Sequence, residues 1–252
     1  MHRFYLPPSA CTGELLRLSE RESHHAVDVL RLRAGDAVLV LDGAGHELDS
    51  EILDPSRRGV TLRVTGRRTP PAPPCAVTLL QAVPKGKAME TILQKATELG
   101  ARRIVPLLTE HCTVQLDAQQ AADKRAKYEQ TVIEALKQSG VPWLPQVDTP
   151  VPLKAFLARG ERFDLALVGS LRAESSHPRR WFDEFTTAHG AAPASVALWV
   201  GPEGDFTGAE LEAIVASGAR PVTLGPQVLR SETAAIYLLS IAAYEAQGAA
   251  RL

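Results

Sequence analysis

The sequence predicts an α/β protein whose parallel sheet is covered by helices on both faces and is preceded by a small β-rich domain. Three observations predict this class: short and nearly continuous apolar runs, segments of helical apolar spacing between them, and a proline-rich break that separates two different patterns. The chain has 252 residues, which is enough to bury one large core or two modest ones.

The break between the two patterns is the segment Thr69–Cys75, which contains four prolines. Proline fixes φ and has no backbone N–H, so this segment suits a stiff, extended linker and neither a helix nor a central strand. We therefore expect one domain at residues 1–69 and a second at residues 76–252, joined by a linker at residues 70–75.

The part before the linker has the pattern of a small β domain. Ala37–Leu41 is an apolar run, and Val60–Val64 alternates between apolar and polar residues, as a half-buried strand does. Residues 14–31 are predicted to form a short helical element. Together these segments predict a compact barrel in the first domain.

The part after the linker alternates between buried strands and amphipathic helices. Strands are predicted at Ala76–Val83, Arg103–Leu108, Phe163–Gly169, Ser195–Val200 and Pro221–Leu224. Helices are predicted at Gly86–Leu99, at about Asp123–Ser139, in a segment that ends near Ser217, and at Ser231–Ala246. In open parallel sheets a ligand sits beyond the carboxyl ends of the strands, so the loops there are the first candidates for a site.

Three segments at that predicted edge carry glycines and polar residues. The strand Ser195–Val200 leads into Gly201-Pro202-Glu203-Gly204. A later strand ends in Leu224-Gly225, and Leu229–Ala235 opens the last helix. Glycines at strand ends let backbone amides approach a ligand, but tight turns require glycine as well. The residues therefore predict a pocket without identifying its ligand.

Helix signals account for several charged side chains in these segments. Thr207 and Glu210 have the spacing of a capping box, which gives Glu210 a structural role. Ser231 suits an N-cap, and Glu232 suits the positive end of the helix dipole. Arg230 opposes that dipole, so we expect an anionic group beside it.

Several classes of protein are excluded by what the sequence lacks. It contains no glycine-rich dinucleotide fingerprint, no G-x-x-x-x-G-K-[ST] loop, no apolar run of roughly 20 residues and no signal-peptide pattern. Three scattered cysteines indicate reduced thiols, with no disulfide framework and no zinc site. We expect a cytoplasmic protein that spans no membrane and binds no metal. Its net charge of -1 does not indicate an RNA-binding protein, so RNA would need a local basic patch.

Taken together, these segments resemble the SPOUT superfamily and, more narrowly, the ribosomal RNA small-subunit methyltransferase E family. The resemblance covers roughly the whole chain. In the second part it rests on GPEG at 201–204, LG at 224–225, LRSETAA at 229–235, Lys85-Gly86, QKATELG at 94–100, Glu134 and Gln138-Ser139. In the first part it rests on His24-His25, Val29-Leu30-Arg31, Gly35-Asp36 and Asp42-Gly43.

The resemblance implies a PUA-like RNA-binding barrel followed by a SPOUT methyltransferase domain with a C-terminal trefoil knot. It implies a homodimer that uses S-adenosylmethionine to methylate N3 of a uridine near the 3′ end of 16S ribosomal RNA in the small subunit. The implied cofactor-binding residues are Val200, Gly201, Pro202, Glu203, Gly204, Leu224, Gly225, Leu229, Arg230, Ser231, Glu232, Thr233 and Ala234. The candidate RNA-binding residues are His24, His25, Arg31, Arg33, Lys85 and Lys95.

The implied chemistry assigns candidate catalytic roles to two residues. Uracil N3 carries a proton and is a poor nucleophile until that proton is lost. Arg230 suits stabilisation of the negative charge that develops on the ring. Glu232, or a carboxylate near Glu98, suits the role of proton acceptor if burial raises its pKa, and the identity of the base stays open.

The sequence departs from the family pattern at three places. Glu110-His111-Cys112-Thr113 stands where a glutamate–arginine step is usual, Val141 replaces an arginine, and Asp205 replaces the second glycine of the usual GPEGG. The first two changes remove positive charge that would hold RNA. The third adds a negative charge beside the predicted cofactor loop.

Two alternatives remain open from the residues. A SPOUT methyltransferase of another RNA, such as tRNA or 23S ribosomal RNA, is disfavoured by the PUA-like first domain in front of Lys85-Gly86. A noncatalytic RNA-binding assembly factor of the same fold is favoured by the missing arginines and disfavoured by the intact LRSETA segment at 229–234.

Overall fold

The computed structural model describes residues 1–114, 116–172 and 174–249 and divides the chain into two compact units. The first unit comprises Met1–Ala72 and Ile133–Leu144, and the second comprises Pro73–Val132 and Pro145–Leu252. The first boundary between the two units lies between Ala72 and Pro73, inside the proline-rich stretch, where no helix or strand forms. That residues 133–144 pack with the first unit was not anticipated by the sequence pattern.

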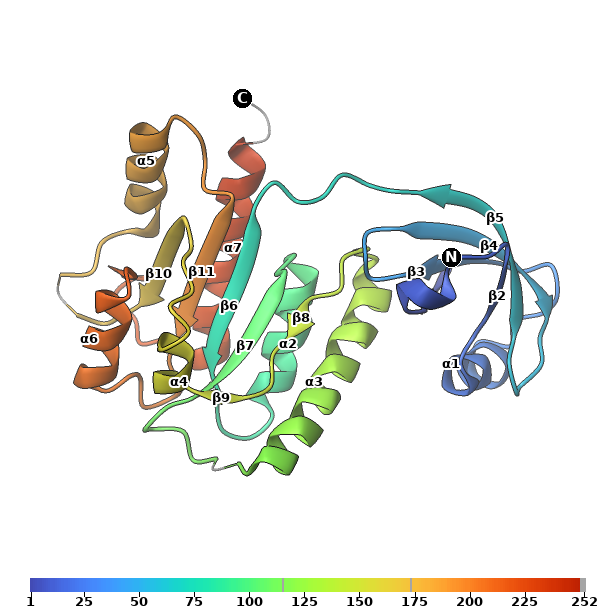
Figure 1. The fold of residues 1–252 in the computed structure, drawn as a ribbon, viewed down its shortest axis with the longest axis horizontal. Coiled ribbons are helices and arrows are strands. Elements are labelled where there is room, and N and C mark those ends of the chain that lie inside the picture. Colours follow the sequence, from blue (N-terminus) through green and yellow to red (C-terminus); the bar gives the residue numbers. More distant parts are fainter. Residues whose placement is uncertain (115, 173, 250–252) are drawn as a thin grey trace. The chain divides into compact units, whose positions relative to one another are not determined.

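The first unit is built on a five-stranded sheet with strand order β1-β3-β4-β5-β2 (Figure 1). The pair β1–β3 is parallel, and the other pairs are antiparallel. The strands are β1 (His2–Tyr5), β2 (Leu15–Arg17), β3 (Ala37–Leu41), β4 (Glu47–Asp54) and β5 (Thr61–Arg68). The unit also contains η1 (Pro8–Ala10), α1 (Glu20–His24) and a π-helical turn at His25–Val29.

The helix predicted at residues 14–31 is only partly present. Residues Leu15–Arg17 form β2, because Leu16 is buried in the core and the strand pairs with β5. The helical part begins after Ser19, whose hydroxyl accepts a hydrogen bond from the Glu22 amide at 3.2 Å. An N-cap serine in an extended conformation therefore separates the strand from the helix.

The end of α3 (Ala118–Ser139) completes the core of the first unit. Leu136 packs with Leu39 and Leu41 of β3. Lys137 and Glu22, whose side chains are only 10% and 9% exposed, form an ion pair with 2.7 Å between Nζ and Oε1. Since a buried charge without a partner is costly, this pair holds the end of α3 against α1.

The second unit is built on a parallel sheet of seven strands, in the order β12-β10-β11-β6-β7-β8 with β9 also paired to β7. The strands are β6 (Ala76–Ala82), β7 (Arg103–Leu108), β8 (Gln146–Val147), β9 (Val151–Pro152), β10 (Leu165–Gly169), β11 (Ser195–Val200) and β12 (Arg220–Val222). All pairings between them are parallel, so the predicted parallel α/β class is confirmed.

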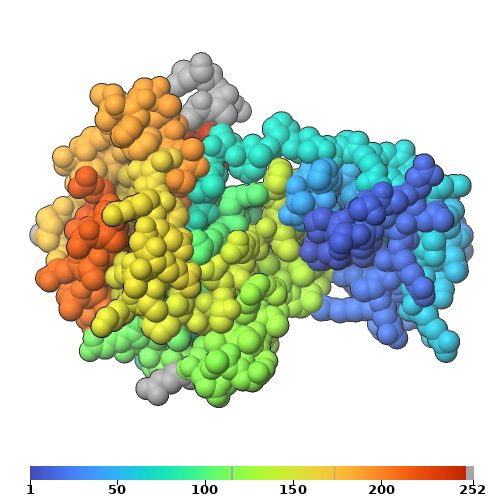
Figure 2. All heavy atoms as spheres, in the orientation of Figure 1, coloured from blue at the N-terminus to red at the C-terminus, as the bar shows by residue number. Residues whose placement is uncertain are grey.

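Helices cover both faces of this sheet. On one face, α4 (Leu153–Leu157) and α6 (Gly208–Ala216) pack against a core that includes Trp199 of β11, and Figure 2 shows the two helices side by side. On the other face lie α2 (Ala88–Glu98) and α7 (Ser231–Ala249), which contact each other (Figure 1). The remaining helix, α5 (Pro178–His189), contacts β10 and α7.

Among the described residues, no helix combines the length and apolar character needed to cross a membrane.

Candidate functional site

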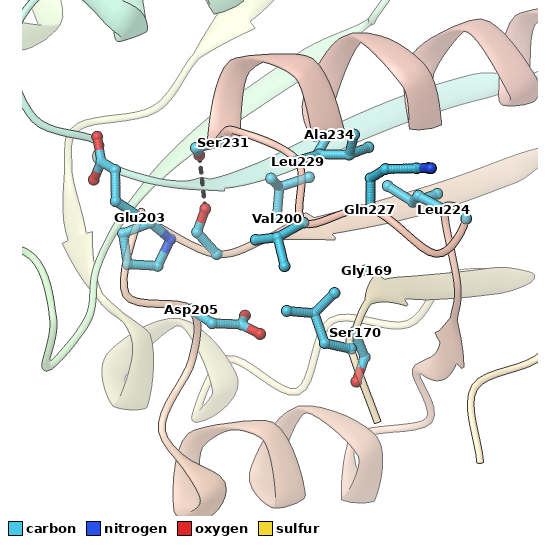
Figure 3. Close-up of a pocket in the computed structure, with 15 residues that line it drawn as sticks. Gly169, Ser170, Val200, Glu203, Asp205, Leu224, Gln227, Leu229, Ser231 and Ala234 are labelled. Carbon is cyan, nitrogen blue, oxygen red and sulfur yellow. Dashed lines mark hydrogen bonds between the residues drawn. The ribbon is translucent and has the colours of Figure 1, made fainter. Parts of the chain in front are cut away.

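A pocket lies beyond the carboxyl ends of β10 and β11, where the strand-following loops meet the start of α7 (Figure 3). This is the position that the parallel-sheet rule predicts for a ligand. The residues that line it are Gly169, Ser170, Leu171, Val200, Gly201, Pro202, Glu203, Asp205, Leu224, Gly225, Gln227, Val228, Leu229, Ser231 and Ala234.

The loop after β11 is a tight turn that requires glycine at its first position. The Asp205 amide donates to the Pro202 carbonyl at 2.9 Å. A Cβ at Gly201 would lie 2.7 Å from Asp205 Oδ1 and 3.1 Å from Asp205 Cα. Because part of this contact is with backbone, a side chain at Gly201 would displace the turn.

The capping box that follows this loop is present, so the structural role predicted for Glu210 is confirmed. Glu210 N donates to the Thr207 hydroxyl at 3.2 Å, and Thr207 N donates to Glu210 Oε2 at 2.9 Å. Glu210 Oε1 also accepts from the Glu110 amide at 2.8 Å. The pocket loop is therefore anchored at its C-terminal end by a fixed helix start and by the segment after β7.

Ser231 ties three elements together at the pocket wall. Its hydroxyl donates to the Gly201 carbonyl at 2.7 Å and accepts from Gln81 Nε2 at 2.9 Å. Gln81 is in β6 and is fully buried, and Ser231 is the first residue of α7. In the described part of the chain, the Ser231 hydroxyl therefore bonds to residues of other elements. It does not bond to a backbone amide in the first turn of α7, as the hydroxyl of an N-cap serine would.

Replacing Ser231 with alanine is expected to lower the free energy of unfolding by about 1–3 kcal/mol, because the buried Gln81 amide and the Gly201 carbonyl each lose a partner. Urea unfolding followed by circular dichroism measures this change. Ser240→Ala is the matched control, since Ser240 is on the same helix and its hydroxyl donates only to the Ile236 carbonyl of that helix. Equal losses in the two variants would contradict a special role for Ser231.

The pocket is acidic. Among the described residues that line it, the ionisable side chains are Glu203 and Asp205. Glu203 Oε1 accepts from the Lys85 amide at 2.9 Å. Burial raises the pKa of Asp205, an effect that the Phe206 amide and the charges of His111 and Arg172 partly offset.

Nine of the thirteen predicted cofactor residues line this pocket: Val200, Gly201, Pro202, Glu203, Leu224, Gly225, Leu229, Ser231 and Ala234. Gly204, Arg230, Glu232 and Thr233 do not line it. Gly204 instead packs on His111, because a Cβ there would lie 3.2 Å from that side chain.

Six lining residues were not among the predicted cofactor-binding residues, namely Gly169, Ser170, Leu171, Asp205, Gln227 and Val228, although Asp205 was predicted to lie beside the cofactor loop. Gly169 ends β10, as predicted, and Ser170 and Leu171 follow it, so the same rule about strand ends would have included all three.

The two predicted catalytic residues lie at the entrance of α7. Arg230 is exposed and directly precedes the helix, and Glu232 is half-buried in its first turn. Both are adjacent to Ser231, which does line the pocket. Their roles stay predictions.

The predicted RNA-binding residues divide between the two units. In the second unit, Lys85 follows β6, and the Lys95 ammonium pairs with Glu98 at 2.8 Å on α2. In the first unit the candidates lie in or just after α1 and the π-helical turn: His24 and His25, then Arg31 and Arg33, both exposed.

Within the described residues, no group of three or more histidine, cysteine, aspartate or glutamate side chains is arranged to hold a metal ion.

Comparison with known proteins identifies the family. A model described as an RNA methyltransferase domain matches residues 71–243, and one described as an RNA methyltransferase PUA domain matches residues 18–65. The ribosomal RNA small subunit methyltransferase E of Bacillus subtilis is 31% identical over 96% of this chain and 91% of its own length. The protein of the same name from Synechocystis is 32% identical over 92% of this chain and 74% of its own length.

A solved structure agrees with these matches. The ribosomal RNA small subunit methyltransferase E of Neisseria gonorrhoeae, bound to S-adenosyl methionine, is 27% identical, covers 96% of both chains and superposes with a TM-score of 0.82. The chain therefore belongs to the ribosomal RNA small-subunit methyltransferase E family, with a PUA domain in front of its RNA methyltransferase domain.

Proposed function

We propose that this chain uses S-adenosylmethionine to methylate N3 of a uridine near the 3′ end of 16S ribosomal RNA in the small subunit. The observation that carries the proposal is the pocket at the strand ends, which the GPEG, LG and LRSETAA segments build together. The Neisseria relative, which covers this chain almost completely, holds the same cofactor.

The residues of the pocket fit this cofactor. Val200, Leu224, Leu229 and Ala234 provide an apolar wall suited to an aromatic ring. The glycines at 201 and 225 leave backbone groups accessible for hydrogen bonds to a ligand. The acidic lining complements a ligand that carries positive charge. S-adenosylmethionine supplies a methyl group on a positively charged sulfur.

In the proposed reaction the chain's own residues prepare the uracil. Arg230 stabilises the negative charge that the ring acquires when N3 loses its proton. Glu232 is the candidate acceptor for that proton, since it lies one turn or less from Arg230 at the same helix start. The pocket residues, Ser231 among them, would hold the methyl donor, and Ser231 is the sequence neighbour of both Arg230 and Glu232.

The proposal includes a homodimer in the cytoplasm and a knotted C-terminal segment. Exposed tyrosines on α7, Tyr237 at 48% and Tyr244 at 70% exposure, support a partner for that helix. After β12 the chain returns to the loop that follows β11, where the Ser231 hydroxyl donates to the Gly201 carbonyl. This return of the chain supports the proposed knot.

The test is transfer of labelled methyl from S-adenosylmethionine to undermodified small subunits and to naked 16S RNA, with the product nucleoside identified by mass spectrometry. We expect 3-methyluridine near the 3′ end. Methylation of tRNA or 23S RNA alone would contradict the proposed substrate. Cofactor binding without any transfer to either substrate would favour a methyltransferase of a different RNA, and the absence of both transfer and cofactor binding would favour the noncatalytic alternative.

Removing positive charge at Arg31 and Arg33 is expected to weaken RNA binding equally for all sequences, because phosphate contacts carry no base information. Arg31 has φ 56°, so Arg31→Asn removes the charge with a residue that tolerates this conformation. We expect the slope of log affinity against log salt to fall by about one for each arginine lost, as measured by fluorescence anisotropy.

The matched control for that experiment is Arg63→Gln. Arg63 belongs to the same unit, but its guanidinium is already paired with Glu51 at 3.1 Å. An unchanged slope in the Arg31 and Arg33 variants, or an equal change in the control, would remove these two residues from the RNA interface.

A further inference from the structure

Asp205 holds an unusual backbone conformation at the edge of the pocket. Its φ is 57°, in the left-handed region that costs most residues free energy and that aspartate tolerates better than most. Its Oδ1 accepts from the following Phe206 amide at 2.8 Å, and its own carbonyl accepts from His111 Nδ1 at 2.9 Å. These two bonds fix both the backbone and the side chain of Asp205.

Asp205 lines the pocket, and Figure 3 shows its carboxylate directed toward the side of the pocket where Ser170 lies. The other acidic side chain of the lining, Glu203, turns away from the centre of the pocket, and its Oε1 is occupied by the Lys85 amide. Asp205 is therefore the main source of negative charge inside the pocket.

This charge is not neutralised by the protein. Among the described residues, no cationic group lies within ion-pair distance of the Asp205 carboxylate, and His111 and Arg172 act on it only as more distant charges. Burial accordingly raises the pKa of Asp205. A carboxylate that is partly desolvated without a partner gains most from a cationic ligand.

We propose that Asp205 is a specificity-determining residue that makes the pocket favour the cationic methyl donor over the product with a neutral sulfur. This inference rests on the proposed use of S-adenosylmethionine. The donor carries a sulfonium, an ammonium and a carboxylate, and thus a single net positive charge. When the methyl group leaves, the sulfonium becomes a thioether and S-adenosylhomocysteine has no net charge. Asp205 thus favours replacement of bound S-adenosylhomocysteine by S-adenosylmethionine.

The test compares the affinities of S-adenosylmethionine and S-adenosylhomocysteine by isothermal titration calorimetry at pH 8. Asp205→Asn keeps an acceptor for the Phe206 amide and removes only the charge. We expect this variant to bind the donor about fivefold to tenfold more weakly and the product within about twofold of the unchanged protein. Asp205→Gly, which also suits the positive φ, is expected to give the same change in the affinity ratio.

Glu203→Gln is the matched control, because it is the same change of acid to amide in the same loop and its carboxylate points away from the pocket. We expect it to alter the ratio of the two affinities less than Asp205→Asn does. Equal weakening of donor and product by Asp205→Asn would show a merely structural role and overturn the inference. So would an unchanged ratio. If the unchanged protein binds neither ligand, the proposed function itself fails, which distinguishes the two failures.

Discussion

The variant Arg230→Ala is expected to turn over about 100- to 1,000-fold more slowly than the unchanged protein, because it loses a preorganised charge that acts on the transition state. Its affinity for S-adenosylmethionine is expected to stay within about threefold, since Arg230 does not line the pocket. Turnover and cofactor affinity are expected to change by different amounts, because Arg230 does not line the cofactor pocket but is adjacent in sequence to Ser231, which does.

The charge of Arg230 is available for a substrate. Among the described residues, no carboxylate lies within ion-pair distance of its guanidinium, and its side chain is exposed. A cation directly before a helix is disfavoured by the dipole of that helix, so the position is unfavourable for the protein alone. An anionic uracil ring or an RNA phosphate would provide the missing compensation.

Single-turnover methyl transfer at saturating RNA measures the chemical step, and calorimetry measures cofactor affinity. Arg230→Lys keeps the charge but not the planar group, so it is expected to retain more activity than Arg230→Ala. Arg179→Ala removes an exposed arginine on α5 that is paired with Asp183, and it serves as the control for loss of charge. An equal loss of turnover and cofactor affinity in Arg230→Ala would contradict the catalytic role.

The strands of the second unit were predictable because a buried parallel strand has an almost continuous apolar sequence. Ser195–Val200 and Arg103–Leu108 form strands at the predicted bounds. By contrast, α5 was not predicted, and only two of its residues, Pro178 and Phe182, are buried. Its ends did carry signals: proline at the first helical position and Gly190 at the C-cap, with φ 71°.

The pocket was predictable in position but not in the direction of its side chains. The rule about strand ends, together with the family resemblance, pointed to Gly201, Gly225 and Ser231, and all three line the pocket. That Asp205 points inward depends on its left-handed backbone, which the sequence does not reveal for a residue other than glycine. The bond between Gln81 and Ser231 joins residues 150 positions apart, so no local pattern could indicate it.

The second large effect is expected for Gly201→Ala, which should weaken cofactor binding by about 100-fold or more, because the added methyl group forces the turn out of place. The Cβ would approach Asp205 Oδ1 to 2.7 Å and the Phe206 amide nitrogen to 3.2 Å. Movement of this turn would also displace the Gly201 carbonyl from Ser231, so one wall of the pocket would lose its anchor.

Calorimetric titration with S-adenosylmethionine measures this loss, and Gly208→Ala is its control. Gly208 is the first residue of α6, and a Cβ there would meet only the end of the Arg172 side chain at 3.9 Å. That control should bind the cofactor normally and should be slightly more stable, because alanine is the better helix former. Combining Gly201→Ala with Asp205→Gly removes the carboxylate contact but leaves the backbone contacts, so only partial recovery is expected. Recovery to the affinity of the Asp205→Gly single variant would show that the side chain of Asp205, and not the turn itself, excludes a larger residue at position 201.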